Sequence, residues 1–345
     1  MKVERSIKLI IPNLIFSGLI LITTLLLTIY YWPQNNMAKN VKVVINQGES
    51  LDIISKNLLN KGVITNEIMF KLLTKIKGLD TSIPIGTFNL KNVNVNKDII
   101  NHLVFGVPDR KRITFLEGWN SKQLAKHLSN EMGLDYNNII KTINDKSFIK
   151  SLGIQSESLE GYLYPDTYFF YDGVDAVSII KRLVREFQVF WNDSNISRAN
   201  SMNLSQHEIL TLASIIEGEA IYDSERPIIS AVYHNRLKRG MKLQADPTIQ
   251  YVIEGGPRRL LNKDLRIKSP YNTYLYQGLP PGPINSPSLM SLRAALYPEE
   301  NEYLYFVAKG DGYHTFSRNE KEHERAKRAF QRVRKKVKRK RNTGL

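Results

Sequence analysis

The sequence Leu-Ser-Gln-His-Glu-Ile-Leu-Thr-Leu-Ala-Ser-Ile-Ile-Glu-Gly-Glu-Ala, residues 204–220, forms the centre of the predicted fold. Ser205 followed three residues later by Glu208 predicts a capping box, which starts a helix. Apolar side chains recur from Ile209 at helical spacing, so one face of this helix is expected to lie against a core. Glu217 lies at the edge of that face, and a partly desolvated carboxyl group can act as a proton donor. This stretch alone also allows a simpler interpretation, in which a solvated charged turn ends the helix.

The composition limits the possible classes of protein. A chain of 345 residues is long enough for two domains and a sizeable core. The absence of cysteine excludes disulfides, thiol nucleophiles and cysteine-ligated metal sites, and leaves the redox compartment open. The net charge of +16 favours a polyanionic partner, which could be nucleic acid, anionic lipid or an acidic polymer.

Residues 9–32 carry no charge and are long enough to cross a bilayer core of roughly 30 Å as a helix. A signal peptide is the alternative, but the apolar run is too long and no cleavage site follows it, which favours an uncleaved single-pass anchor. Three basic residues within residues 1–8 predict a cytoplasmic N-terminus, although two lysines beyond the span weaken the contrast. We therefore expect the protein in the cytoplasmic (inner) membrane, with the remaining chain outside the cytoplasm.

A short polar linker, residues 33–40, leads into a small module that spans residues 41–108. The pattern predicts a strand at 41–45, a capped helix ending at Gly62, a second helix at 66–77 and a strand pair near 86–90. This order resembles a LysM-like subdomain, a class that recognises carbohydrate. An unspecialised α/β packing module is the alternative.

Residues 109–330 are expected to form the second, larger domain, so that the predicted fold class is α+β with an N-terminal transmembrane helix. A helix is predicted at 224–237. It is followed by polar and aromatic loops stiffened by proline, which suit the walls of a ligand cleft. Two adjacent strands are predicted at 303–308 and 312–317.

The C-terminal part, residues 320–342, is predicted as a charged helix that leads into a basic tail at 331–345. We expect this tail to be attracted to anionic lipid or wall polymer. Nucleic-acid binding is not expected, because no reading motif is present and a membrane span argues against access to DNA. The six histidines show no metal-ligand spacing, so neither a metal nor a cofactor is predicted.

Several separated motifs, taken together, resemble the YceG-like endolytic murein transglycosylases. They follow the family order over nearly the whole chain, although each motif alone is a weak signal. One departure is Gly218, where a better helix former is expected, because glycine inside a helix costs about 1 kcal/mol. The motifs are the N-terminal anchor, Glu117-Gly118-Trp119, the run 159–168, Ala213 to Glu217 with Glu219, Tyr233 to Leu237, Leu243 to Thr248, Ser269 to Tyr274, Gly278 to Ile284 and Tyr303 to Ala308.

The resemblance implies an enzyme that cuts glycan strands internally between N-acetylmuramic acid and N-acetylglucosamine and leaves 1,6-anhydromuramoyl ends. It implies Glu217 as the single general acid and then base, because the substrate's own 6-hydroxyl is the nucleophile. Asp246 is expected to stabilise oxocarbenium charge, while Gln244, Asn272, Tyr274 and Asn235 are expected to bind substrate. The implied partners are peptidoglycan strands, the lipid bilayer and cell-wall synthases. A non-catalytic peptidoglycan-binding protein is the rival interpretation.

Overall fold

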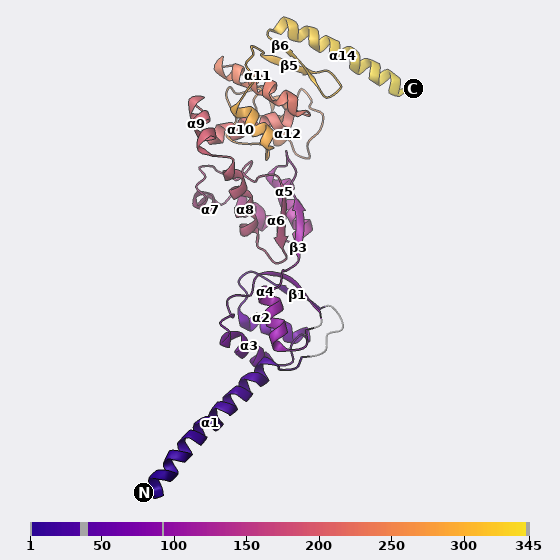
Figure 1. Cartoon of the computed structure of the whole chain (residues 1–345). Helices are drawn as coiled ribbons and strands as arrows, with labels where there is room; N and C mark the ends of the chain where they lie inside the picture. The colour runs from indigo at the N-terminus through magenta and orange to yellow at the C-terminus, as the bar shows by residue number, and fades with distance from the viewer. Residues whose placement is uncertain (1, 35–40, 92, 343–345) are drawn as a thin grey trace. The chain divides into compact units, whose positions relative to one another are not determined.

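The computed structural model describes residues 2–34, 41–91 and 93–342, so most of the predicted linker at 33–40 lies outside the described residues. The chain forms two compact units (Figure 1). The smaller unit comprises Met1–Ile113 with Tyr168–Asp175, and the larger comprises Thr114–Thr167 with Ala176–Leu345. The division therefore falls a few residues after the predicted boundary at 108, and a short later segment returns to the smaller unit.

The smaller unit has a β-α-α-β-α core. Its strands β1 and β2 pair antiparallel, from Val41 opposite Leu90 to Ile45 opposite Gly86, so the predicted strand pair near 86–90 is one strand whose partner is β1. Carbohydrate binding by this unit stays a prediction. The elements are α1 (Lys2–Tyr30), β1 (Val41–Ile45), α2 (Leu51–Asn60), α3 (Glu67–Ile76), β2 (Gly86–Leu90) and α4 (Asn96–Phe105).

Helix α1 is the one helix, among the described residues, that is long and apolar enough to cross a membrane. Its window Asn13–Tyr30 has a mean hydropathy of 2.0, and only 6% of it is buried. The last turn differs, because Ile29 is only 2% exposed and belongs to the core of the smaller unit. The Ile29 carbonyl also accepts a hydrogen bond from the Asn96 amide at 3.2 Å. The apolar helix is thus attached directly to the folded unit at its C-terminal end.

The larger unit is mainly helical. Strands β3 and β4 pair with each other and contain the points at which the chain passes between the two units, while β5 and β6 form an antiparallel hairpin. From β3 onward the elements of the chain are β3 (Arg110–Thr114), α5 (Ser121–Met132), α6 (Tyr136–Ile143), α7 (Lys146–Ser151), β4 (Thr167–Tyr171), α8 (Ala176–Val189), α9 (Asp193–Ser201), α10 (Gln206–Glu219), η1 (Asp223–Glu225), α11 (Arg226–Lys238), α12 (Asp246–Val252), η2 (Asp264–Arg266), α13 (Leu289–Leu296), β5 (Tyr305–Ala308), β6 (His314–Ser317) and α14 (Glu320–Asn342), and most residues of β3 and β4 belong to the smaller unit.

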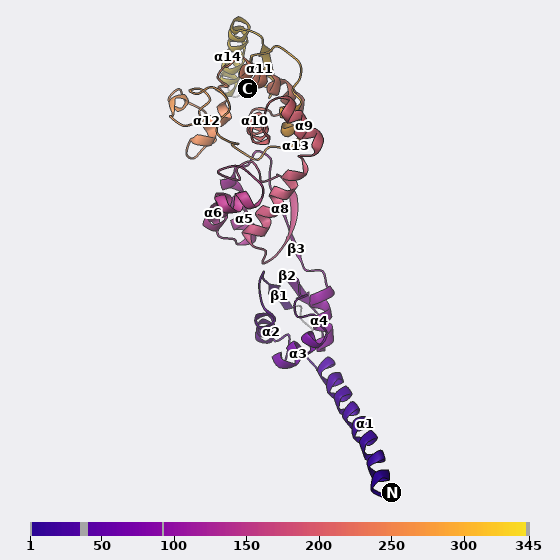
Figure 2. The ribbon, with the colours of Figure 1, turned by 90° about the vertical axis from the view of Figure 1, so that its left-hand side faces the viewer.

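Helix α10 is the central element of the larger unit. Ser205 and Glu208 form the predicted capping box, so the helix begins where the sequence indicates. Every residue from Ile209 to Ile216 is buried, which is more than the single apolar face that was predicted. Helices α9, α11, α12 and α13 pack around it (Figures 1 and 2). The two glutamates at the C-terminal end of α10 therefore directly follow a fully buried run of eight residues.

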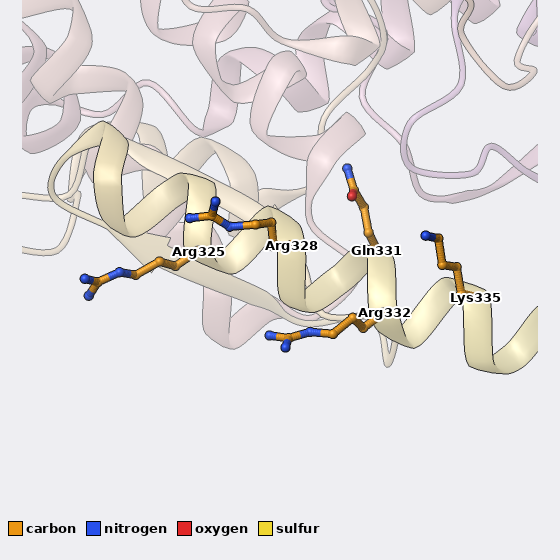
Figure 3. A pocket seen from close by; sticks show the side chains of 5 residues that line it. All are labelled: Arg325, Arg328, Gln331, Arg332 and Lys335. Atoms are coloured by element: carbon orange, nitrogen blue, oxygen red, sulfur yellow. The ribbon is translucent and has the colours of Figure 1, made fainter.

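Helix α14 is the predicted basic helix. Four cationic side chains, Arg325, Arg328, Arg332 and Lys335, line a shallow hollow of about 370 Å³ on this helix together with Gln331 (Figure 3). The N-terminal half of the helix contacts the β5–β6 hairpin. Only residues up to 335 have described side chains, so most of the predicted tail at 331–345 has no side-chain description.

Candidate active site

The predicted substrate-binding loops line a pocket of about 520 Å³ in the larger unit, which we call the Glu219 pocket. A volume of this size suits a small polar ligand or part of a polymer. The pocket has an apolar wall from β5 and α14, which includes Phe306, Val307 and Phe330. Its polar lining consists of Glu219, Arg236, Gln244, Asp246, Tyr274, His314, His323 and Lys327.

Thr273 brings two of these loops together. Its carbonyl accepts the Gln244 backbone N–H at 3.1 Å, and its hydroxyl accepts the Ala245 N–H at 2.9 Å. The same hydroxyl lies 2.9 Å from that of Thr248, and both threonines are buried. The segments 243–248 and 269–274 are therefore joined by buried polar contacts, which explains how residues about 30 positions apart line one pocket. The segment 243–248 was predicted as a loop, but helix α12 begins within it at Asp246.

Gln244 has an unusual backbone conformation, with φ of 51°. A non-glycine residue in this left-handed region costs on the order of 1–3 kcal/mol, and such residues are concentrated at ligand sites. The Gln244 side chain is exposed, and it lines the pocket beside Asp246. The backbone conformation of Gln244 therefore supports a ligand site here, and no pattern in the sequence predicted it.

Glu219, not Glu217, is the glutamate in this pocket. The Tyr233 hydroxyl donates a hydrogen bond to the Glu219 carboxylate at 2.9 Å, and the Asp246 backbone N–H donates another. Burial is the main cause that raises the pKa of Glu219 to about 7, and the negative charge of Asp246 raises it further. Asp246 itself accepts a short hydrogen bond from the Tyr274 hydroxyl. A carboxyl group that is half protonated near neutral pH can both give and take a proton there.

Glu217 has a different environment, although it is only two residues away. Its side chain is 7% exposed and forms an ion pair with Arg226, whose Nη1 lies 3.1 Å from Oε2 and whose Nη2 donates to Oε1 at 3.3 Å. Ser288 donates two further hydrogen bonds to Oε2, from its N–H at 2.9 Å and its hydroxyl at 2.6 Å. Residues two apart on a helix point to nearly opposite sides. Glu217 thus joins the end of α10 to the first residues of α11 and α13.

The Glu117-Gly118-Trp119 motif lies beside Glu217. The Gly118 N–H donates to the Ser286 carbonyl, and the Ser286 N–H donates to the Trp119 carbonyl, both at 2.8 Å. A Cβ on Gly118 would lie 3.8 Å from the Glu217 Cγ. Partial burial, followed by the nearby Glu217 charge, raises the pKa of Glu117. The sequence predicted no role for this motif. The structure places it against the ion pair between Glu217 and Arg226.

The Tyr233-His234-Asn235-Arg236 motif on α11 ties this helix to its surroundings through each of its side chains. Tyr233 reaches Glu219, and the His234 Nε2 lies 2.9 Å from the Ala295 carbonyl. The Asn235 amide donates to the Asn301 and Tyr303 carbonyls at 2.9 and 3.0 Å. Asn235 does not line the Glu219 pocket. Its amide instead binds the segment 301–303, which directly precedes β5.

Asn272 also serves the protein's own backbone. It is completely buried, and its amide donates to the Leu265 and Ile267 carbonyls at 3.1 and 2.8 Å. Its carbonyl accepts the Tyr274 N–H at 2.9 Å. Of the predicted substrate-binding residues, Gln244, Asp246 and Tyr274 therefore line the pocket. Asn272 does not line it, but its side chain binds the Tyr274 backbone.

A second buried carboxyl group, Glu160, belongs to the motif at residues 159–168, which contains three tyrosines. It is 5% exposed and accepts hydrogen bonds from the Ser121 N–H and from the Ser121 hydroxyl at 2.7 Å. Burial raises its pKa to about 7. Tyr162 and Tyr168 of the same run are also buried. Among the residues that the structure describes, no cluster of three or more His, Asp or Glu side chains could hold a metal ion.

Three comparisons with known proteins agree on one family. The model of the YceG-like family matches residues 43–329. The endolytic murein transglycosylase of Bacillus subtilis (strain 168) is 35% identical over 307 residues, which cover 84% of each chain. The endolytic murein transglycosylase of Streptococcus pneumoniae serotype 2 is 29% identical over 84% of this chain and 58% of its own.

A solved structure is similar over most of its length. The crystal structure of a YceG-like protein from Listeria monocytogenes superposes with a TM-score of 0.59 and 33% sequence identity, covering 83% of this chain and 98% of the other. The α+β fold and the pocket thus define a mixed α+β protein with a pocket that contains carboxyl groups. Within that class, the chain belongs to the YceG-like family.

Proposed function

We propose that the protein is an endolytic murein transglycosylase that cleaves the bond between N-acetylmuramic acid and N-acetylglucosamine and leaves a 1,6-anhydromuramoyl end. The observation that carries this proposal is the position of Glu219 in one pocket with Gln244, Asp246 and Tyr274. The names of the two relatives support the reaction type.

Glu219 is proposed as the group that moves the proton. In its protonated form it gives the proton to the glycosidic oxygen as the bond from C1 to that oxygen breaks. The Asp246 carboxylate stabilises the positive charge that develops on the sugar ring. The Glu219 carboxylate then takes the proton of the muramic acid 6-hydroxyl while O6 attacks C1. The second step closes the anhydro ring and returns Glu219 to its acid form without consuming water.

This assignment differs from the sequence prediction, which named Glu217 as the acid. The two glutamates are tested together with the variants Glu219→Gln and Glu217→Gln, each digested with purified glycan strands and analysed by mass spectrometry. We expect Glu219→Gln to lose anhydromuramoyl products by at least about a hundredfold. Glu217→Gln is expected to lose activity only in proportion to the loss of folded protein. The reverse result would assign the acid to Glu217.

The rival function is a wall-binding protein without catalysis, in which both units grip glycan. Binding alone produces no anhydromuramoyl ends, so wild-type protein that retains strands but releases no such product would establish the rival. The smaller unit is proposed to be LysM-like and to bind the glycan strand as an accessory site in either case, because its order of strands and helices is the one that the sequence prediction used.

We further propose that α1 anchors the protein in the cytoplasmic membrane with both units outside the cytoplasm, near cell-wall synthases. The uncharged run and its exposure support this topology. A reporter fused after Leu345 that is active only outside the cytoplasm tests it. An inactive reporter in a fusion protein that is produced at full length would contradict the topology without affecting the proposed chemistry.

A further inference from the structure

The Glu219 pocket is lined by both acidic and basic side chains. The carboxyl groups of Glu219 and Asp246, from the end of α10 and the start of α12, are called its acidic wall. The basic side chains from α11 and α14, namely Arg236, His323 and Lys327, are called its basic wall. The acidic wall is used by the proposed reaction. The basic wall is not, and it requires its own explanation.

Arg236 gives this wall a fixed positive charge. It is 7% exposed, and its Nε donates to the Leu304 carbonyl at 2.6 Å while its Nη1 donates to the Leu243 carbonyl at 2.7 Å. These acceptors are neutral carbonyls, and none of the ion pairs among the described residues includes Arg236. The Glu219 carboxyl group interacts with the Arg236 charge without forming an ion pair, so this charge is only partly compensated. An anion in the pocket would lower the remaining cost of burying the guanidinium.

His323 offers an unused polar atom beside this charge. Its Nδ1 is buried and has no hydrogen-bond partner among the residues that the structure describes. The ring stacks on that of Tyr305, with centroids 4.9 Å apart, so its orientation is fixed. A buried ring nitrogen without a partner is unfavourable, and a ligand that hydrogen-bonds to it removes the penalty.

Lys327 lies one helical turn after His323 and adds a second positive charge to the pocket lining. Its ammonium group lies 2.9 Å from the Glu324 carboxylate, but both side chains are nearly half exposed. An ion pair of this kind contributes little stability, so a carboxylate of a ligand can compete for the ammonium group.

We propose that Arg236, His323 and Lys327 bind a carboxylate of the peptide stem that muramic acid carries, so that the enzyme prefers glycan strands with stems over bare strands. The inference rests on the proposed function. Of the two alternating sugars, only muramic acid carries a peptide, while N-acetylglucosamine has no ionised group. A stem carboxylate on the basic wall would therefore fix which sugar lies beside Glu219 and which glycosidic bond is cut.

The test compares two substrates with the full-length protein in detergent. One is glycan strands with peptide stems, and the other is the same strands after the stems have been removed with an amidase. We expect wild-type protein to cleave the stem-bearing strands with a kcat/KM about fivefold or more higher, the size expected for one partly exposed ionic contact. The variant Lys327→Ala should lose most of this preference through a higher KM, and Lys327→Arg should keep it.

Arg328→Ala is the matched control, because Arg328 is the next residue on α14, is exposed and lines the hollow of Figure 3 instead of the pocket. It removes the same charge from the same helix and should keep the wild-type preference. Equal preference in Lys327→Ala and Arg328→Ala would overturn the proposal, as would equal cleavage of both substrates by wild type. Failure of wild type to release anhydromuramoyl products from either substrate would instead overturn the proposed function.

Discussion

Gly218 and Pro247 approach each other so closely that a Cβ on Gly218 would lie 2.6 Å from the Pro247 Cβ and 2.8 Å from its Cγ. Gly218 lies in the last turn of α10 between the two glutamates, and Pro247 follows Asp246 in the first turn of α12. The glycine therefore permits the contact that brings Asp246 to Glu219. The one departure from the family pattern that the sequence showed thus lies at a close contact between the two helices.

The first prediction concerns this contact. Gly218→Ala adds helix propensity worth up to about 1 kcal/mol, but the rigid proline ring must move, and overpacking of this kind costs about 1–3 kcal/mol. We expect a lower thermal midpoint, by a few degrees, and a larger loss of activity because Asp246 shifts with Pro247. Lys238→Ala, at an exposed position of α11, serves as the control. Unchanged stability and activity in Gly218→Ala would show that the contact is not needed.

The second prediction is a pH profile that depends on Asp246. A general acid must be protonated, so kcat/KM should fall as the pH rises above about 7, the pKa of Glu219. The charge of Asp246 contributes to that raised pKa. Asp246→Asn should therefore move the alkaline limb to lower pH, and it should also reduce the maximal rate about tenfold or more because the ring charge loses its partner. Rates of glycan cleavage between pH 5 and 9 measure both effects.

The third prediction concerns stability at the same residue. The pKa of Glu219 is raised from 4.5 to about 7, so its ionised form is disfavoured in the folded state. The contribution of the neutral group to stability is complete below about 4.5 and is lost as the pH rises through 7. Glu219→Gln removes this loss, so the variant should be more stable than wild type at pH 8, by about 1–3 kcal/mol. The thermal midpoints of the two proteins should converge near pH 4.5.

Helix start signals and strand patterns in the sequence located several of the elements, among them α10, α11, α14 and the strands β1, β5 and β6. Both ends of α14 agree with the predicted bounds, and the capping box starts α10 as expected. These features depend on residues close together in the chain, where spacing alone carries the information. Helix α12 was missed because Pro247, which suggested a loop, occupies the first turn of a helix, where proline is tolerated.

The position of the candidate acid could not be obtained from spacing. Glu217 and Glu219 lie on either side of Gly218 in the sequence. No nearby residue indicates which glutamate contacts Arg226 and which contacts Asp246. Those partners lie 9 and 27 residues further along the chain. The environment of a carboxyl group depends on such long-range packing, so the sequence identified the pair of glutamates but not their separate surroundings.

The last prediction separates the structural role of Glu217 from catalysis. Arg226 and Glu217 are 6% and 7% exposed and form two contacts, so Arg226→Met should leave a buried carboxylate without its partner. Such a change costs about 3–5 kcal/mol. Glu217→Gln keeps an acceptor for Ser288, and the double variant should be less destabilised than the sum of the two single variants. Thermal midpoints of the four proteins give the coupling between the two side chains.

If activity per folded molecule is retained in Glu217→Gln while its stability falls, the ion pair holds α10 in place and Glu219 is left as the group that moves the proton. Loss of activity in Glu217→Gln without any loss of stability would instead place Glu217 in the reaction.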